Sequence, residues 1–109
     1  MVRFLLYNLD MDTLSLGPLL EKLKGIYPQL EKEYQISSLE VFGSFLRGEE
    51  KEGSDLDLLI TFSKPPSLFT FVRLENYLSD TLGVKVDLVM KDSLKPNIGE
   101  RILAEAQAI

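Results

Sequence analysis

The chain has 109 residues, of which 45% are hydrophobic, and its 17 acidic and 12 basic side chains give a formal net charge of −5. This length supports one hydrophobic core, so we expect residues 1–109 to form a single domain with no room for a further binding domain. The chain has no cysteine and no histidine, which excludes disulfides, thiolate chemistry, imidazole metal sites and histidine-based triads. Carboxylates remain as the reactive groups.

The charge distribution and the apolar runs limit the partners of this chain. Lys and Arg are scattered along the sequence, which argues against direct nucleic-acid binding and favours a basic protein partner. No apolar run approaches the ~18 residues of a membrane span. Residues 1–9 are too short a run, and too soon broken by Asp10, for a secretory signal. We therefore expect a cytoplasmic protein with no membrane contact.

The first part of the chain predicts one long helix. Residues 3–6 suit a short strand or a partner-facing arm, and the role of residues 1–12 stays open. From Ser15 to Tyr34 apolar residues recur at helical spacing, with Pro18 allowed in the first turn. Pro28 is expected to kink or split this helix.

The middle of the chain predicts two strands around a short helix. Leu39 to Phe42 is apolar enough for a strand, and Ser44 to Glu50 fits a short helix before a polar loop. Asp55 to Phe62 follows as the second strand, with Leu56, Leu58 and Ile60 on its core face.

The last part predicts helix, strand and helix. Ser67 caps a helix that Gly83 closes, and Val84 to Met90 forms the third strand. Ser93 can cap a final helix whose apolar face runs to Ile109. The order predicts an α/β or α+β fold, a small mixed sheet with helices on one face and an open catalytic face on the other.

Three aspartates in this pattern predict a metal site. The side-chain period of two puts Asp55 and Asp57 on one strand face, roughly 7 Å apart at about 3.3 Å rise per residue. Asp87 lies on the polar face of the third strand. Mg²⁺ prefers such oxygen ligands, and two ions about 4 Å apart can hold the attacking and leaving oxygens of a phosphoryl displacement. The alternative for a lone Asp-x-Asp is solvated aspartates on an edge strand.

The residues before these aspartates suit a phosphate. Gly43 and Ser44 end one strand and open a helix, where backbone N–H groups are free to bind an anion. Arg47 can reach the same phosphate or form a surface pair with Glu50 or Glu52. Ser54 either touches a bound phosphate group or shapes the turn, and we favour the turn.

The chain carries Gly-Ser, two residues and Arg-Gly, then Ser-Asp-x-Asp, and later Val-Asp-Leu-Val around Asp87. This set of motifs resembles the minimal nucleotidyltransferase family of the polymerase-beta superfold. The resemblance covers most of the chain. It implies that Gly43 and Ser44 grip the nucleoside triphosphate and that Asp55, Asp57 and Asp87 hold the metals, with Asp87 helping to deprotonate an acceptor hydroxyl. It implies transfer of a nucleotide, with ATP as the expected substrate and two Mg²⁺ ions as the expected cofactor.

Among minimal nucleotidyltransferases, this small acidic chain looks most like the antitoxin of HEPN/MNT toxin–antitoxin pairs. That resemblance implies transfer of AMP to a tyrosine of a partner HEPN toxin, with the two proteins forming a hetero-oligomer. Two alternatives stay open, a small-molecule nucleotidyltransferase and a non-catalytic antitoxin that neutralises its partner by binding alone. The acceptor, the number of nucleotides transferred and the stoichiometry are not given by the sequence.

Overall fold

The computed structural model describes residues 15–109, so the predictions for residues 1–12 lie outside the described part. Within that part no helix is long and apolar enough to cross a membrane. The helices are α2 (Leu16–Tyr34), α3 (Ser44–Arg47), α4 (Leu68–Leu82) and α5 (Pro96–Glu105), and a short 3-10 turn, η1, covers Lys91–Ser93. The strands are β1 (Ile36–Phe42), β2 (Leu56–Phe62), β3 (Val86–Met90) and β4 (Gln107–Ala108).

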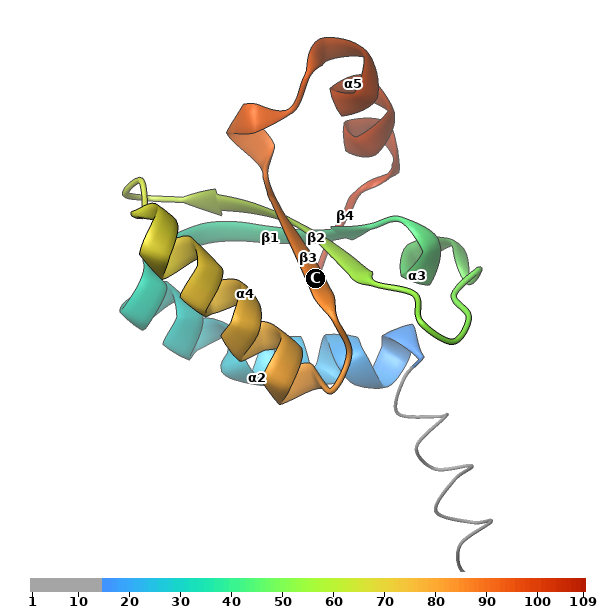
Figure 1. Cartoon of the computed structure of the whole chain (residues 1–109), viewed down its shortest axis with the longest axis horizontal. Coiled ribbons are helices and arrows are strands. Elements are labelled where there is room, and N and C mark those ends of the chain that lie inside the picture. Colours follow the sequence, from blue (N-terminus) through green and yellow to red (C-terminus); the bar gives the residue numbers. More distant parts are fainter. Residues whose placement is uncertain (1–14) are drawn as a thin grey trace, which may run out of the picture.

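The strands form one mixed sheet in the order β3-β2-β1-β4. β1 pairs antiparallel with β2 and with the two-residue β4, whereas β2 and β3 are parallel. Parallel strands need a long crossover, which α4 supplies. Figure 1 shows α2 and α4 side by side on one side of the sheet and α5 on the other. The predicted small mixed sheet with helices is confirmed, but the expectation of helices on one face alone is wrong because α5 lies on the other side.

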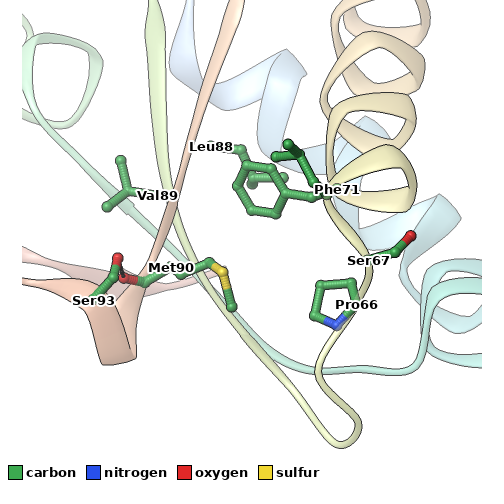
Figure 2. Close-up of a pocket in the computed structure, with 8 residues that line it drawn as sticks. Pro66, Ser67, Phe71, Leu88, Val89, Met90 and Ser93 are labelled. Carbon is green, nitrogen blue, oxygen red and sulfur yellow. Dashed lines mark hydrogen bonds between the residues drawn. The ribbon is translucent and has the colours of Figure 1, made fainter.

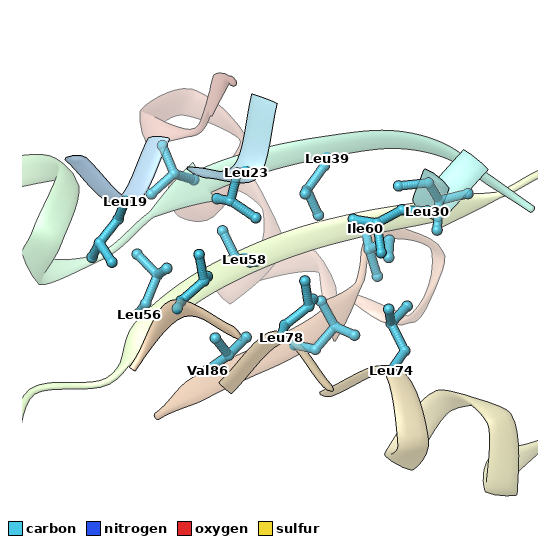
Figure 3. Packing of buried hydrophobic residues seen from close by; sticks show 14 of the residues in the cluster. Leu19, Leu23, Leu30, Leu39, Leu56, Leu58, Ile60, Leu74, Leu78 and Val86 are labelled. Carbon is cyan, nitrogen blue, oxygen red and sulfur yellow. The ribbon is translucent and has the colours of Figure 1, made fainter. Parts of the chain in front are cut away.

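The core lies between the sheet and the two long helices, and leucines from every layer fill it (Figure 3). Leu19, Leu23, Leu74 and Leu78 are fully buried on the helices. Burying each such side chain is worth about 1.5–3 kcal/mol relative to exposure, so this contact fixes the sheet against the helices. Facing them from the sheet are the residues that the period of two predicts for β2, namely Leu56, Leu58 and Ile60.

The opposite face of the sheet is open at one end and covered further along. Leu59 and Phe42 are buried there but are not members of the main core. The η1 segment lies against β2 in this region. The C-terminal part of the chain therefore covers part of the face on which the aspartates were expected.

The start and the end of α4 follow the sequence signals. The Ser67 hydroxyl accepts a hydrogen bond from the Thr70 N–H at 3.1 Å, and Gly83 ends the helix at φ +72°. A Ser cap and a left-handed glycine satisfy backbone groups that a helix end leaves unpaired. Both boundaries were predicted correctly.

Two helix predictions are wrong in part. α2 is not split at Pro28, which is exposed on the solvent side of a helix that continues to Tyr34. Water can bond the backbone carbonyl that a proline leaves free on that side. The predicted helix from Ser44 ends at Arg47 and not at Glu50, because Gly48 turns left-handed at φ +71°.

The prediction for the C-terminal helix is also wrong at both ends. Ser93 does not cap it, since its hydroxyl donates to the carbonyl of Met90 at the end of β3. α5 instead begins at Pro96, a residue that suits a first helical position because its missing N–H would have no partner there. It ends at Glu105, and the chain then pairs with β1 as β4.

Candidate active site

Asp57 and Asp87 stand directly opposite each other on adjacent parallel strands. Phe42 of β1 is the partner of Asp57 on its other side, so the three residues form one row across the sheet. Residues paired in this way project from the same face. Asp55 lies just before the first residue of β2. The structure thus brings Asp57 and Asp87 together, as the sequence pattern predicts.

The row has a strong effect on the ionisation of Asp57. Burial of the carboxyl group raises the pKa of Asp57 to about 6, and repulsion from the charges of Asp87 and Asp55 adds to the shift. The Arg47 charge acts in the opposite direction and lowers it. A carboxylate that is hard to ionise because of neighbouring carboxylates is one that a cation would stabilise.

The acidic groups do not form a closed metal cage. Within residues 15–109 no three acidic side chains lie close enough together to enclose a metal ion. The Asp55 carboxylate has Lys85 Nζ at 3.9 Å as a cationic neighbour. The donor chemistry nevertheless fits a divalent cation, because Mg²⁺ uses one or two carboxylates and takes its other oxygens from water and phosphates.

The Gly43 turn packs directly against Asp57. Gly43 has φ +80°, and a Cβ at this position would overlap the Asp57 carboxylate. Position 43 therefore requires glycine for its backbone conformation and for the close approach of the carboxylate. Ser44 follows as the first residue of α3. The predicted phosphate turn and the predicted metal site are thus adjacent.

Arg47 is engaged by two carboxylates. Its Nε pairs with Glu49 Oε1 at 2.7 Å and its Nη1 pairs with Glu105 Oε1 at 2.5 Å. The alternative of a surface pair with Glu50 or Glu52 is therefore wrong in its partners. Both pairs raise the pKa of Arg47 still further above its ordinary value. The guanidinium is thus held beside the Gly43 turn.

Ser54 shapes the loop before β2. Its hydroxyl accepts a hydrogen bond from the Lys51 N–H at 3.0 Å, and its own N–H donates to the Lys51 carbonyl at 2.9 Å. These two bonds close the turn that precedes Asp55, in agreement with the prediction that Ser54 shapes the turn. A contact between Ser54 and a triphosphate stays a prediction.

Glu105 is a site residue that sequence reasoning missed. Its Oε2 accepts a hydrogen bond from the Gly43 N–H at 3.0 Å across 62 residues of sequence. This bond and the Arg47 contact lower the pKa of the Glu105 carboxyl group. The sequence carries no signal for the contact, because it depends on how the last residues return to the edge of β1.

The outer edge of β3 is held by side chains of α4. Ser79 Oγ accepts from the Val86 N–H and Glu75 Oε2 accepts from the Leu88 N–H, both at 2.9 Å. These N–H groups flank Asp87 on the outer edge of β3, beside which residues 15–109 place no further strand. The two bonds therefore fix the backbone that carries Asp87.

An apolar hollow of about 370 Å³ lies elsewhere, between the start of α4 and the end of β3. Figure 2 shows Phe71, Leu88 and Met90 around it, with Pro66 and Ser67 at the helix start. None of the predicted site residues lines it. The acidic row, formed by Asp57 and Asp87 with Asp55 beside it, thus lies on the open surface of the sheet and outside this hollow.

Comparisons with known proteins agree with the geometry. Residues 20–109 match the family described as nucleotidyltransferase domain. The chain is similar to protein adenylyltransferase MntA of Thermococcus cleftensis, with 43% identity over 95 residues that cover 87% of this chain and 96% of the relative.

Solved structures give the same result. A protein assigned as a minimal nucleotidyltransferase superposes with a TM-score of 0.76 at 35% identity, covering 88% of this chain and 97% of that one. A complex of tri-AMPylated Shewanella oneidensis HEPN toxin with MNT antitoxin shares the fold at 16% identity, with a TM-score of 0.62 and coverage of 83% of this chain and 70% of that one.

Proposed function

The chain belongs to the nucleotidyltransferase domain family, and from that premise we propose that it is a Mg²⁺-dependent protein adenylyltransferase. In this proposal it transfers AMP from ATP to a tyrosine of a HEPN-type toxin and so acts as the antitoxin of that partner. The observation that carries the proposal is the pairing of Asp57 and Asp87 beside the Gly43 turn. Acidic groups next to backbone N–H groups that can donate to an anion are what a metal-bound triphosphate needs.

The phosphate end of the site is assigned to the Gly43 turn. Gly43 and Ser44 offer backbone N–H groups at the start of α3, and Arg47 adds a guanidinium that can bind two oxygens at once. Ser54 supports the loop that leads to Asp55. Together these residues would orient the triphosphate with its α-phosphate toward the acidic row.

The acidic end is assigned to the cation. Asp55, Asp57 and Asp87 would hold Mg²⁺, with two ions expected. When bound, the ions neutralise charge on the phosphate oxygens and position the reacting groups. The raised pKa of Asp57 supports this assignment, because burial and then repulsion from Asp87 and Asp55 disfavour its charged form, which a bound cation would stabilise.

The reaction is a displacement at the α-phosphorus of ATP. The acceptor oxygen forms a new bond to that phosphorus, the bond from the α-phosphorus to the bridging oxygen breaks, and pyrophosphate leaves with the electron pair. Asp87, the more exposed member of the row, accepts the hydroxyl proton. The remaining contribution of the protein is positioning and charge neutralisation, which is the usual basis of catalysis at phosphorus.

The choice of a protein acceptor rests on the relatives. One similar protein is named a protein adenylyltransferase, and a more distant one with the same fold is the MNT antitoxin in a complex with a tri-AMPylated HEPN toxin. The exposed position of Asp87 suits an acceptor carried by a macromolecule, which can reach the surface of the sheet directly. A protein tyrosine meets that requirement.

The test is mass spectrometry of the partner toxin after incubation of the complex with ATP and Mg²⁺. The wild-type chain should add one or more AMP groups, and the double variant Asp55→Asn/Asp57→Asn should add none. Asp80→Asn/Asp92→Asn is the matched control, because it changes the net charge equally at two exposed aspartates. Peptide mapping should place the added mass on a tyrosine.

The same experiment separates transfer from inhibition by binding. An unmodified partner that is fully inhibited by both the wild type and the Asp55/Asp57 variant would overturn the transferase proposal and leave a binding antitoxin. Added AMP that persists in EDTA would overturn the requirement for Mg²⁺.

A further inference from the structure

Glu105 occupies the position that the proposed function gives to a phosphate. One of its carboxylate oxygens accepts from the Gly43 N–H at 3.0 Å, and the other pairs with Arg47 Nη1. These are the backbone donor and the cation assigned to the triphosphate. The carboxylate thus satisfies the same two groups with the same charge type that a phosphate oxygen would bring.

The position of Glu105 follows from the strand register. β4 pairs antiparallel with β1, with Val41 opposite Gln107. Extending this register by two residues places Gly43 opposite Glu105, at the point where α5 ends. The pairing of β4 with β1 therefore places the backbone of Glu105 beside Gly43, so the contact does not depend on the side-chain conformation of Glu105 alone.

The attachment that holds Glu105 there is small. β4 has two residues, and beyond them the Ile109 N–H donates to the Leu39 carbonyl at 3.3 Å. Ala108 and Gln107 are both exposed. A two-residue edge strand buries little surface, and neither Glu105 nor the residues of β4 belong to the main core, against which only Ile109 of this terminal segment packs.

The charges around Glu105 favour its exchange for a ligand that brings its own cations. Its carboxylate lies close enough to raise the pKa of Asp57, so it adds a negative charge to an acidic site. Arg47 also has Glu49 as a second partner at 2.7 Å, so it stays paired when Glu105 leaves. A metal-bound triphosphate would replace one anion by another and compensate the acidic row as well.

We propose that Glu105 is a tethered anion of the nucleotide site: it holds the triphosphate-binding groups in place while the site is free of nucleotide, and it must leave them when ATP binds. This inference rests on the proposed function and deepens it. Glu105 then sets the affinity of the site for triphosphate, because the fraction of molecules with Gly43 and Arg47 free determines the apparent dissociation constant.

The test compares nucleotide binding by the full-length wild type and by Glu105→Gln, using calorimetry with α,β-methylene ATP and Mg²⁺. Gln keeps the shape of the side chain but removes its charge. The variant should bind α,β-methylene ATP about tenfold more tightly, as expected if about one wild-type molecule in ten has the site free. Tripolyphosphate should show the same gain, and adenosine, which has no phosphate, should bind both proteins equally.

Glu100→Gln is the matched control, since Glu100 is an exposed glutamate of the same helix. It should bind all three probes as the wild type does. Glu105→Ala serves as a second variant, and a nitrogen–proton NMR spectrum gives an independent readout. In that spectrum the Gly43 amide signal should move in both Glu105 variants, and it should move in the wild type when tripolyphosphate is added.

Equal or weaker binding of tripolyphosphate by both Glu105 variants would overturn the inference and make Glu105 a positioning partner of Arg47. The result can be separated from the proposed function by measuring AMP transfer on the same samples. Tighter triphosphate binding without AMP transfer would contradict only the transferase proposal. Unchanged binding with normal AMP transfer would contradict only the role of Glu105.

Discussion

The carboxylate of Asp57 lies against the α-carbon of Gly43, so closely that position 43 has no room for a side chain. This contact joins the turn proposed to bind phosphate to the row proposed to bind metal. Any side chain added at position 43 must therefore displace the Asp57 carboxylate.

Gly43→Ala should be severely damaging. Alanine at φ +80° is strained and its Cβ would overlap Asp57, so we expect the free energy of unfolding to fall by about 2–4 kcal/mol. AMP transfer should be lost even below the melting temperature of the variant. Gly48→Ala is the control, because Gly48 also has positive φ but has open space around it. It should lose about 1 kcal/mol and keep its activity, and equal losses of activity in both variants would contradict the argument.

Asp57→Asn should stabilise the protein in the absence of metal at pH 8. The pKa of Asp57 is raised from about 3.8 to about 6 in the folded chain, so between these values the folded state binds more protons than the unfolded state. The free energy of unfolding contributed by this group therefore falls as the pH rises from about 4 to 6. Because the carboxyl group is half-exposed and screened by solvent, we expect a gain of only about 1 kcal/mol in the variant.

Thermal unfolding at several pH values, in EDTA, measures this effect. The gain from Asp57→Asn should be full above pH 6 and absent below pH 4. Asp80→Asn, at an exposed position of α4, should show no such profile. A variant that is less stable than the wild type at pH 8 would show that the Asp57 charge is stabilised by something other than a cation.

Arg47→Lys should weaken ATP binding more than it slows transfer. Lysine keeps the charge but cannot bind two oxygens through a planar fork, so we expect the KM for ATP to rise about tenfold with a smaller change in kcat. The ion pairs of Arg47 are exposed, so the free energy of unfolding should change by less than about 1 kcal/mol. Steady-state kinetics checks the prediction, and an unchanged KM would place Arg47 outside the phosphate site.

Ser79→Ala should lower both stability and transfer. It leaves the Val86 N–H without its partner on the edge strand that carries Asp87, at a cost of about 1–2 kcal/mol. Hydrogen exchange of the Val86 amide should accelerate in the variant. Asn76→Ala on the exposed side of α4 is the control. If transfer is unaffected while exchange accelerates, the position of Asp87 does not depend on this bond.

Local signals were sufficient for the parts of the fold that local interactions decide. The Ser67 cap and the Gly83 terminus are set by residues within one helical turn, and both were predicted correctly. The alternation of β2 fixed its core face for the same reason, because burial on one side of a strand repeats every second residue. The facing of Asp57 and Asp87 follows once these strands are parallel neighbours.

Contacts between distant parts of the chain were not predictable in this way. Glu105 reaches Gly43 because β4 pairs with β1. A strand of two residues is too short to show the alternating pattern from which a strand is predicted. The unbroken α2 depends on Pro28 facing solvent, which is a property of packing and not of the local sequence. In both cases contacts between distant segments determined the structure, and the local sequence pattern contains no information on those contacts.

The hydrogen bonds that β3 donates to side chains of α4 also affect how copies of this protein can associate. An edge strand with free N–H groups can accept a strand from another molecule, which is a common route to sheet extension and aggregation. Glu75 and Ser79 accept from the N–H groups of Leu88 and Val86, so an added strand would have to displace both side chains to reach these two donors. The two contacts from α4 therefore work against the pairing of β3 with its own copies, as well as holding the strand that carries Asp87.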